Sequence, residues 1–381
     1  MPAKILYLNT APDDRIQGMV VAGMRRYAAT RGWDVEAIHW AKSRPEDIAA
    51  LLAARRPVAG CVVECSDGNS RLLPTCFGQV PIVYLHAAPY FAGGRVSRIS
   101  TDNGAVAMSA YRELAIGLPS CYAVVGVCWN LSWANDRITR FQSLCAESGS
   151  PCHVFPFRDE PKAERMARLA SWVQRLPCKT AVFAVNDRTA AEVADAARAS
   201  HRPIPRELAL LGVDNDDRVC LAGKPTISSI QIDAERVGYM AARMIGSAPA
   251  TPATAVVGPI LAVRRESTGG FGRREPFALE AVEMIRREAC DGLTAESLAA
   301  RFRCSRSLFK LRFREATGHS AFDEIMHVRL EKVFTLLART ETRIGAIAGL
   351  CGFGSDVELR HLFRSRTGMS MREWRKANAV K

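Results

Sequence analysis

The stretch IGAIAGLCGFGSDVELRHLFRSR, residues 344–366, contains the pattern that decides the fold of the C-terminal third of the chain. Its first seven residues, Ile344–Leu350, are small or apolar and predict a short helix. A glycine-containing turn follows, and Ser355–Ser365 then predicts a second helix with Leu359 and Phe363 on its inner face. This order is typical of a helix-turn-helix unit, whose second helix lies in the major groove of DNA.

The same arrangement occurs once more, upstream. Thr294 is a good N-cap for a short helix over 295–301, and Ser305 caps a second helix that runs to about Ala316. A long helix, Phe322–Leu337, joins the two units. The residues expected to contact DNA are Ser305, Arg306, Ser307, Lys310 and Arg314 in the first unit, and Ser355, Asp356, Val357, Arg360 and Arg364 in the second.

Positive charge is concentrated in this part of the chain. The formal net charge is +13, and residues 273–381 contain 21 Lys or Arg against 14 Asp or Glu, whereas residues 1–272 contain 31 against 25. The C-terminal part is therefore about three times as basic per residue. A solvated basic surface has the same composition, but with the duplicated pattern the charge favours a nucleic-acid partner over an ordinary helical bundle.

The first 263 residues alternate apolar strand patterns with helical patterns. Repeated units of this kind predict parallel sheets that are covered by helices on both faces, with ligands beyond the carboxyl ends of the strands. The expected fold class is α/β, a two-lobed domain of parallel sheets, followed by an all-α double helix-turn-helix domain. The strand patterns lie at Lys4–Asn9, Val35–His39, Gly60–Val63, Ile82–Leu85, Ile99–Thr101, Tyr122–Gly126, His153–Phe157, Thr180–Val185, Leu208–Val213 and Ile227–Ile230.

The apolar periodicity stops at RRESTGGFGRR, residues 264–274, where Gly, Ser and Arg predominate. Such composition is typical of a linker. The expected domains are therefore an α/β effector-binding domain over residues 1–263, a linker over 264–275 and a DNA-binding domain over 276–381.

Polar residues follow several of the predicted strands. A hydroxyl-rich ligand is bound by carboxylate and amide groups, by an arginine that clamps them and by a tryptophan that stacks on an apolar sugar face. Taken singly, an acidic residue after a strand is more often a helix cap and a lone tryptophan is more often in the core; their joint placement favours a binding site. The candidate effector-binding residues are Asp14, Arg15, His86, Trp133, Arg137, Asn186, Asp187, Asp214 and Ser229.

The C-terminal motifs resemble the signature of the AraC/XylS transcription-regulator domain over about Pro276–Ala377. That resemblance implies two helix-turn-helix units that read two adjacent segments of the major groove. Two positions differ from the usual pattern, Met371 in place of a proline and Glu358-Leu359 in place of an aromatic pair. The motifs are IGAIA at 344–348, CGF at 351–353, FR at 363–364, GMS at 368–370 and WR at 374–375.

The N-terminal motifs resemble the effector domain of the LacI/GalR family, which is similar to periplasmic sugar-binding proteins, over about residues 3–268. The resemblance implies that Arg137, Asn186 and Asp214 bind sugar hydroxyls, and that His86 and Ser229 occupy more variable ligand positions. The motifs are RISTDN at 98–103, WANDR at 133–137, FAVND at 183–187, LGVDN at 211–215 and RREST at 264–268.

A LacI-like sensor ahead of an AraC-like reader implies a sequence-specific transcription regulator. We expect an activator of genes for the use of xylose or a related monosaccharide. Its expected partners are double-stranded DNA, the sugar, a second copy of the chain and RNA polymerase. An alternative stays open: a constitutive DNA-binding regulator whose α/β domain serves only dimerisation and has no sugar effector.

Other classes of function lack support in the sequence. The chain has 381 residues, of which 48% are hydrophobic and 24% charged, as in ordinary globular proteins. An apolar run of the ~20 residues needed to cross a bilayer is missing, as is a signal-peptide pattern, so we expect a cytoplasmic protein. The 12 cysteines lack metal-site spacing, and catalytic and phosphate-loop motifs are also missing. We therefore expect no metal, no cofactor and no enzyme activity.

Overall fold

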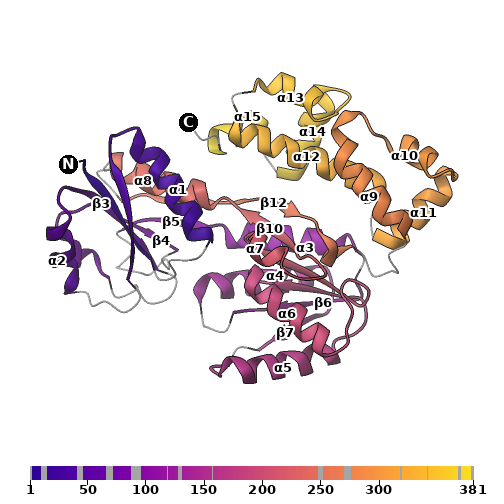
Figure 1. The fold of residues 1–381 in the computed structure, drawn as a ribbon, viewed down its shortest axis with the longest axis horizontal. Helices are drawn as coiled ribbons and strands as arrows, with labels where there is room; N and C mark the ends of the chain where they lie inside the picture. The colour runs from indigo at the N-terminus through magenta and orange to yellow at the C-terminus, as the bar shows by residue number, and fades with distance from the viewer. Residues whose placement is uncertain are drawn as a thin grey trace.

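The structure is a computed structural model, and it shows two α/β lobes and a helical C-terminal domain (Figure 1). Asp14, one of the candidate effector-binding residues, lies outside the described residues. The structure describes residues 2–9, 15–40, 46–65, 72–86, 96–117, 119–127, 131–156, 158–247, 252–269, 276–317, 320–340, 342–367 and 370–378.

The first lobe is built on a six-stranded parallel sheet with the order β11-β5-β4-β3-β1-β2. Helices α1 and α8 cover one face, where they bury Ile5 and Tyr7 of β1. Helix α2 lies over the other face, where Leu6 and Leu8 are buried. Burial of both faces explains the continuous apolar runs of these strands. The elements are β1 (Lys4–Asn9), α1 (Arg15–Ala29), β2 (Asp34–His39), α2 (Asp47–Ala54), β3 (Val58–Glu64), η2 (Pro74–Phe77), β4 (Ile82–Leu85), β5 (Ser97–Thr101), α8 (Ala234–Ser247) and β11 (Thr254–Val257).

The second lobe repeats this plan with the order β12-β10-β9-β8-β6-β7. Its strands are parallel except β12, which is antiparallel to β10. Helices α3 and α4 pack on one face of the sheet and α5 and α6 on the other. The elements are α3 (Asn103–Ala115), β6 (Cys121–Val125), α4 (Ser132–Glu147), β7 (Cys152–Phe155), α5 (Lys162–Arg175), β8 (Thr180–Ala184), α6 (Asp187–Ala199), β9 (Leu208–Val213), α7 (Asp217–Cys220), β10 (Ser228–Ile232), β12 (Pro259–Val263) and η4 (Glu266–Thr268).

The chain crosses between the lobes three times, after β5, after β10 and between β11 and β12. Helix α8 and strand β11 therefore return to the first lobe. Helix α8 approaches α1 very closely at two glycines, because a Cβ on Gly23 would lie 1.8 Å from the Glu235 carbonyl oxygen and a Cβ on Gly238 1.8 Å from that of Val20. Only glycine permits this approach of the two helix backbones.

The C-terminal domain is entirely helical in its described residues. Its core is formed by apolar residues of both units, among them Phe309 and Phe313 of α11 and Leu359 and Phe363 of α14. The buried Arg329 of α12 ties the domain together by donating to the carbonyl oxygens of residues 289 and 293, at 2.8 Å each. The elements are α9 (Pro276–Glu288), η5 (Ala289–Asp291), α10 (Ala295–Arg301), α11 (Arg306–Thr317), α12 (Ala321–Arg339), α13 (Ile344–Leu350), α14 (Asp356–Thr367) and α15 (Met371–Asn378).

The predicted fold class is confirmed, and the differences are local. Strands β11 and β12 and helices α2, α7, α8 and α15 were not predicted. The first residues of the expected linker, 264–269, pack against the second lobe instead of leaving it: Ser267 is fully buried, and its hydroxyl donates to the Leu210 carbonyl oxygen at 2.6 Å. Hydrogen bonds of the Ser228, Ser267 and Thr268 side chains hold this segment. Amino-acid composition alone does not predict such contacts.

Candidate functional site

A cavity of about 140 Å³ lies between the two lobes, at the carboxyl ends of their strands. Strands β3, β4 and β5 lead to it from one lobe and β8, β9 and β10 from the other, so polar residues far apart in the sequence meet there. Five candidate effector residues line it, namely His86, Trp133, Arg137, Asn186 and Asp214. The full lining is Ile16, Gln17, Glu64, His86, Thr101, Asn103, Trp133, Arg137, Asn186, Asp214 and Ile232.

Arg137 of α4 is the fixed cation of the cavity, with 4% of its surface exposed. Its Nε donates to Asn103 Oδ1 at 3.0 Å and its Nη1 to the Val185 carbonyl oxygen at 2.6 Å. The guanidinium carbon lies 4.9 Å from the centre of the Trp133 ring. Burial lowers the pKa of Arg137, which the charge of Asp214 opposes. A held arginine beside an indole presents donors and an apolar face to one small ligand.

Asn186 and Asp214 each follow a buried strand and combine a structural and a cavity-lining position. Asn186 Oδ1 caps α6 by accepting from the Thr189 amide at 2.9 Å, which leaves its amide hydrogens for other acceptors. The Asp214 backbone has φ +108°, and its amide donates to the Ile230 carbonyl oxygen at 2.8 Å. Asn186 is therefore both a helix cap and a residue that lines the cavity.

Two cavity residues that sequence reasoning missed are Gln17 and Glu64. Gln17 Oε1 and Glu64 Oε1 are buried and accept no hydrogen bond from the described residues. The other oxygen, Glu64 Oε2, accepts from the Tyr7 hydroxyl at 3.2 Å. Buried acceptors without donors are costly, and hydroxyl groups of a ligand in the cavity would supply the donors. A sequence signal existed for Glu64, the single charged residue at the end of the strand VAGCVVE.

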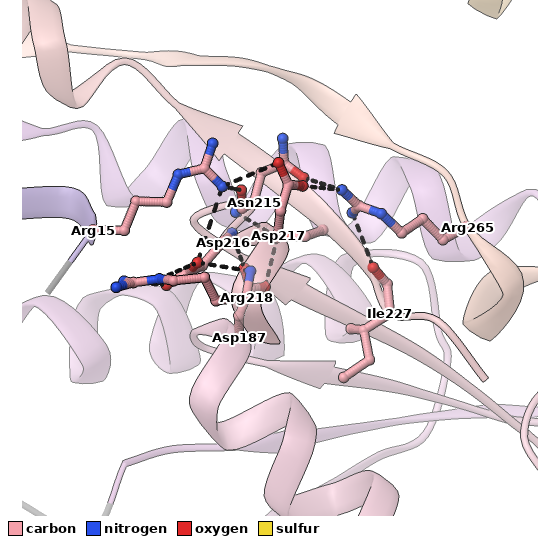
Figure 2. Close-up of polar contacts among 9 residues, drawn as sticks. Arg15, Asp187, Asn215, Asp216, Asp217, Arg218, Ile227 and Arg265 are labelled. Carbon is pink, nitrogen blue, oxygen red and sulfur yellow. Dashed lines mark hydrogen bonds and ion pairs between the residues drawn. The ribbon is translucent and has the colours of Figure 1, made fainter. Parts of the chain in front are cut away.

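Arg15 binds the opposite lobe instead of lining the cavity (Figure 2). Its Nη1 donates to the Asn215 carbonyl oxygen at 2.7 Å and lies 3.4 Å from Asp217 Oδ2. From the other side, Arg265 Nη2 donates to Asn215 Oδ1 at 2.6 Å and to Asp217 Oδ1 at 3.0 Å. Two arginines from distant parts of the chain thus hold the loop after β9, and Arg15 links the first lobe to it.

Asp187 and Ser229 also lie outside the lining of the cavity, and their contacts explain why. The Ser229 hydroxyl donates to Asp187 Oδ1 at 2.6 Å and accepts from the Asn215 amide at 2.9 Å. The Asp216 amide donates to Asp187 Oδ2 at 2.8 Å. Burial raises the pKa of Asp187 to about 6, although these hydrogen bonds oppose the shift. Since both side chains are engaged with the loop after β9, they position Asp214 and its neighbours.

The second site consists of the outer faces of α11 and α14. Their predicted caps have that position: Ser305 Oγ accepts from the Leu308 amide at 3.2 Å, and Ser355 Oγ from the Glu358 amide at 3.1 Å. On α11 the side chains of Arg306, Ser307, Lys310 and Arg314 are all exposed. The three basic ones have no ion-pair partner among the described residues, so their charge is directed to solvent.

The outer face of the second recognition helix, α14, is less positively charged than that of α11. Arg360 forms an ion pair with Asp356 one turn earlier, and Glu358 Oε2 accepts from the Gly354 amide at 3.1 Å. The charges of Asp356 and Glu358 are therefore partly compensated at the N-terminal end of α14. Arg364 is exposed, as is Val357. Other exposed residues on these helices were not predicted to contact DNA, among them Leu308, Leu311 and His361.

Two lobes around a polar cavity, followed by paired helix-turn-helix units with exposed basic helices, define a DNA-binding transcription regulator with an effector domain of its own. Residues 120–268 match the family of periplasmic binding protein-like domains, and residues 298–377 match a helix-turn-helix domain family. The chain therefore combines a periplasmic-binding-protein-like domain with a helix-turn-helix domain, and in this it is similar to regulators of the AraC/XylS type with a sensor of that kind.

Its relatives are transcription regulators. The Xylose operon regulatory protein of Escherichia coli (strain K12) is 28% identical over 312 residues, which are 79% of this chain and 80% of that protein. The protein of the same name from Haemophilus influenzae (strain Rd) is 24% identical over 286 residues, 73% and 74% of the two chains.

Solved structures have the same fold. One described as the xylose-binding transcription activator xylR covers 99% of both chains, with 25% identity and a TM-score of 0.59. The transcriptional regulator CelR bound to cellobiose covers 70% of this chain and 86% of its own, with 19% identity and a TM-score of 0.59. At that identity the likeness to CelR concerns the fold alone. Within the described residues, the structure contains no helix long and apolar enough to cross a membrane.

Proposed function

We propose that this protein activates transcription of genes for the use of D-xylose or a closely similar aldopentose when the sugar binds between the two lobes. The observation that carries the proposal is the cavity, where donors of Arg137 and Asn186 face acceptors of Asp214, Glu64 and Gln17 beside the Trp133 ring. The name shared by the sequence relatives, Xylose operon regulatory protein, supports this choice of sugar.

The charges that line the cavity favour an uncharged sugar. Two carboxylates, Glu64 and Asp214, face one arginine, Arg137. A sugar acid or a sugar phosphate would add negative charge beside the two carboxylates and be repelled. A neutral monosaccharide instead supplies hydroxyl hydrogens to the carboxylates and hydroxyl oxygens to the guanidinium. The proposed effector therefore contains neither carboxylate nor phosphate.

Sugar binding would act by selecting one arrangement of the lobes. A ligand that contacts both lobes is bound more tightly when they are close together, so it shifts the population towards the closed arrangement. The second lobe ends in the segment 264–269, and the first helix of the helical domain, α9, begins at Pro276. Closure of the lobes would thereby change the position of the two recognition helices directly, within one chain.

The proposal includes further partners that the AraC/XylS resemblance implies. The protein would bind DNA as a dimer, contact RNA polymerase and act in the cytoplasm, and its role involves no catalytic step. Sedimentation velocity of the full-length protein tests the dimer: a monomer at tens of micromolar would count against it.

A thermal-shift measurement with a panel of sugars tests the effector. A ligand that binds only the folded state raises the melting temperature, by an amount that grows with concentration. D-Xylose or a close aldopentose is expected to raise it, whereas D-xylonate and xylose phosphates have no effect. Asp214→Asn is the control and should abolish the rise. No response to any neutral monosaccharide would favour the constitutive regulator whose α/β domain serves only dimerisation.

A further inference from the structure

The two recognition helices carry exposed aliphatic side chains amid charged ones. Leu311 of α11 is 56% exposed and Val357 of α14 is 73% exposed. Leu311 lies two residues from Phe309 and two from Phe313, which are both buried, so it points about 200° away from each of them. It therefore occupies the centre of the outward face of α11. Val357 stands in the same relation to the buried Leu359.

Exposed basic side chains lie on the same helices as these two aliphatic residues, and Asp356 and Glu358 flank Val357. Lys310 and Arg314 are exposed beside Leu311, and Arg360 and Arg364 are exposed on the same helix as Val357. A polyanion attracted by these cations brings its surface against the aliphatic side chains. The charge complementarity thus identifies the occupant of this face as DNA, and the position on the second helix of each unit places the side chains in the major groove.

The major groove offers one apolar group for such a side chain. Among the base edges displayed there, thymine alone carries a methyl group, at C5, and the other features are hydrogen-bond donors and acceptors. An aliphatic residue that faces a donor or acceptor leaves it without a partner, which is costly. Against a thymine methyl it removes apolar surface from water instead.

We propose that Leu311 and Val357 are specificity-determining residues that each contact the C5 methyl of a thymine, one in each of the two major-groove segments that one protomer reads. This inference rests on the DNA-binding function proposed above and adds which base the two helices select. Lys310 and Ser307 supply hydrogen bonds around Leu311, and the thymine contact fixes the register of each helix along the groove.

Replacement of thymine by uracil tests the proposal, because uracil lacks only the methyl and keeps the same hydrogen-bonding edge. A pool of random duplex DNA is first enriched with the full-length protein in the presence of D-xylose. The enriched DNA is then copied with either dTTP or dUTP, and the Kd of each form is measured. We expect the uracil form to bind about 16-fold more weakly for each bound protomer, about fourfold for each methyl lost.

Alanine variants test whether Leu311 and Val357 cause the difference in Kd between the thymine and uracil forms. Leu311→Ala and Val357→Ala should each reduce the ratio of the two Kd values to about fourfold, and the double variant to about one. Arg314→Ala should weaken both forms equally and leave the ratio unchanged. Leu221→Ala, which shortens a leucine that is 55% exposed in the sensor domain, should change neither Kd.

Three results would overturn the proposal. Equal binding of the thymine and uracil forms by the unaltered protein would contradict any methyl contact. A ratio that persists in the double variant would assign the methyl contact to other residues. If no sequence is enriched from the pool, the DNA-binding function fails and the inference fails with it, which distinguishes this outcome from the first two.

Discussion

Arg264 and Glu324 form an ion pair of 2.9 Å that joins the sensor to the DNA-binding domain. Arg264 follows β12 and Glu324 lies in the first turn of α12, the helix that connects the two helix-turn-helix units. Arg264 Nε also donates to Glu113 Oε1 of α3 at 2.5 Å. Burial alone would lower the pKa of Arg264, and the two glutamates raise it above its usual value. One buried guanidinium therefore contacts both domains.

Loss of this ion pair is expected to uncouple sugar binding from DNA binding. Glu324→Gln keeps the shape of the side chain and removes its charge, while Arg264 keeps Glu113. We expect the affinity for D-xylose to change less than twofold and the effect of the sugar on DNA affinity to shrink at least fivefold. Isothermal titration and fluorescence anisotropy measure the two quantities.

The matched control for that variant is Glu207→Gln, which breaks the Arg202–Glu207 ion pair of 2.6 Å inside the second lobe. It should leave the coupling intact. A Glu324→Gln protein that responds to sugar as fully as the unaltered protein would show that this ion pair does not transmit the signal.

Glu64→Gln should weaken sugar binding and stabilise the sugar-free protein. A charged hydrogen bond to a hydroxyl is worth about 1.5–3 kcal/mol, so the Kd for the sugar should rise roughly 10- to 100-fold. Without sugar, Glu64 Oε1 is buried and has no donor among the described residues. Removing that charge should raise the melting temperature by about 2–4 °C. A lower melting temperature with unchanged sugar affinity would make Glu64 a structural residue.

Asp187 should make stability depend on pH. Burial raises the pKa of Asp187 from 3.8 to about 6 in the folded protein. Between these values the folded state binds a proton that the unfolded state has lost, so the contribution of Asp187 to stability falls as pH rises through this window and levels off about one pH unit above the folded-state pKa. The change amounts to roughly 3 kcal/mol.

Urea unfolding of the unaltered protein and of Asp187→Asn at several pH values measures this contribution. The difference in unfolding free energy between the two proteins should change across the window and be flat above about pH 7. Parallel curves from pH 4 to pH 7 would mean that the folded and unfolded states ionise Asp187 alike.

The elements that depend on local pattern were predictable. The helix Ile344–Leu350 was predicted with its observed bounds, and β1 and β9 likewise, because their apolar residues and flanking polar residues are contiguous. Strands β11 and β12 were not predicted, since they are short, lie at sheet edges and are stabilised by pairing with strands far away in the sequence.

Some residues of the cavity could likewise be predicted from local sequence patterns, and others could not. Arg137, Asn186 and Asp214 belong to motifs that can be recognised along the chain, and all three line the cavity. Gln17 has no local signal that places it in the cavity, whereas Glu64 had one, as the single charged residue of its strand. Arg15, Asp187 and Ser229 belong to similar polar clusters, yet they bind the loop after β9 instead.

The two kinds of arginine on the DNA-binding face should differ in salt dependence. If Arg306 contacts a guanine, Arg306→Ala should cost about 1–3 kcal/mol and relax the preference at one base pair. Arg364→Ala, at an expected phosphate contact, should weaken binding to all operators evenly and flatten the slope of log K against log salt by about 0.9. Titrations on enriched and single-mismatch operators at several salt concentrations separate the two. An even loss with a flatter slope for Arg306→Ala would place it at a phosphate.

The most direct test of the central claim is the affinity of the full-length protein for its enriched operator, measured by fluorescence anisotropy with and without saturating D-xylose. We expect the sugar to lower the Kd for DNA at least 10-fold, and Asp214→Asn to bind the operator as the sugar-free protein does and to show no response to the sugar. A Kd for DNA that stays the same with D-xylose and with every neutral aldopentose tried would contradict the claim that this cavity controls the DNA-binding domain.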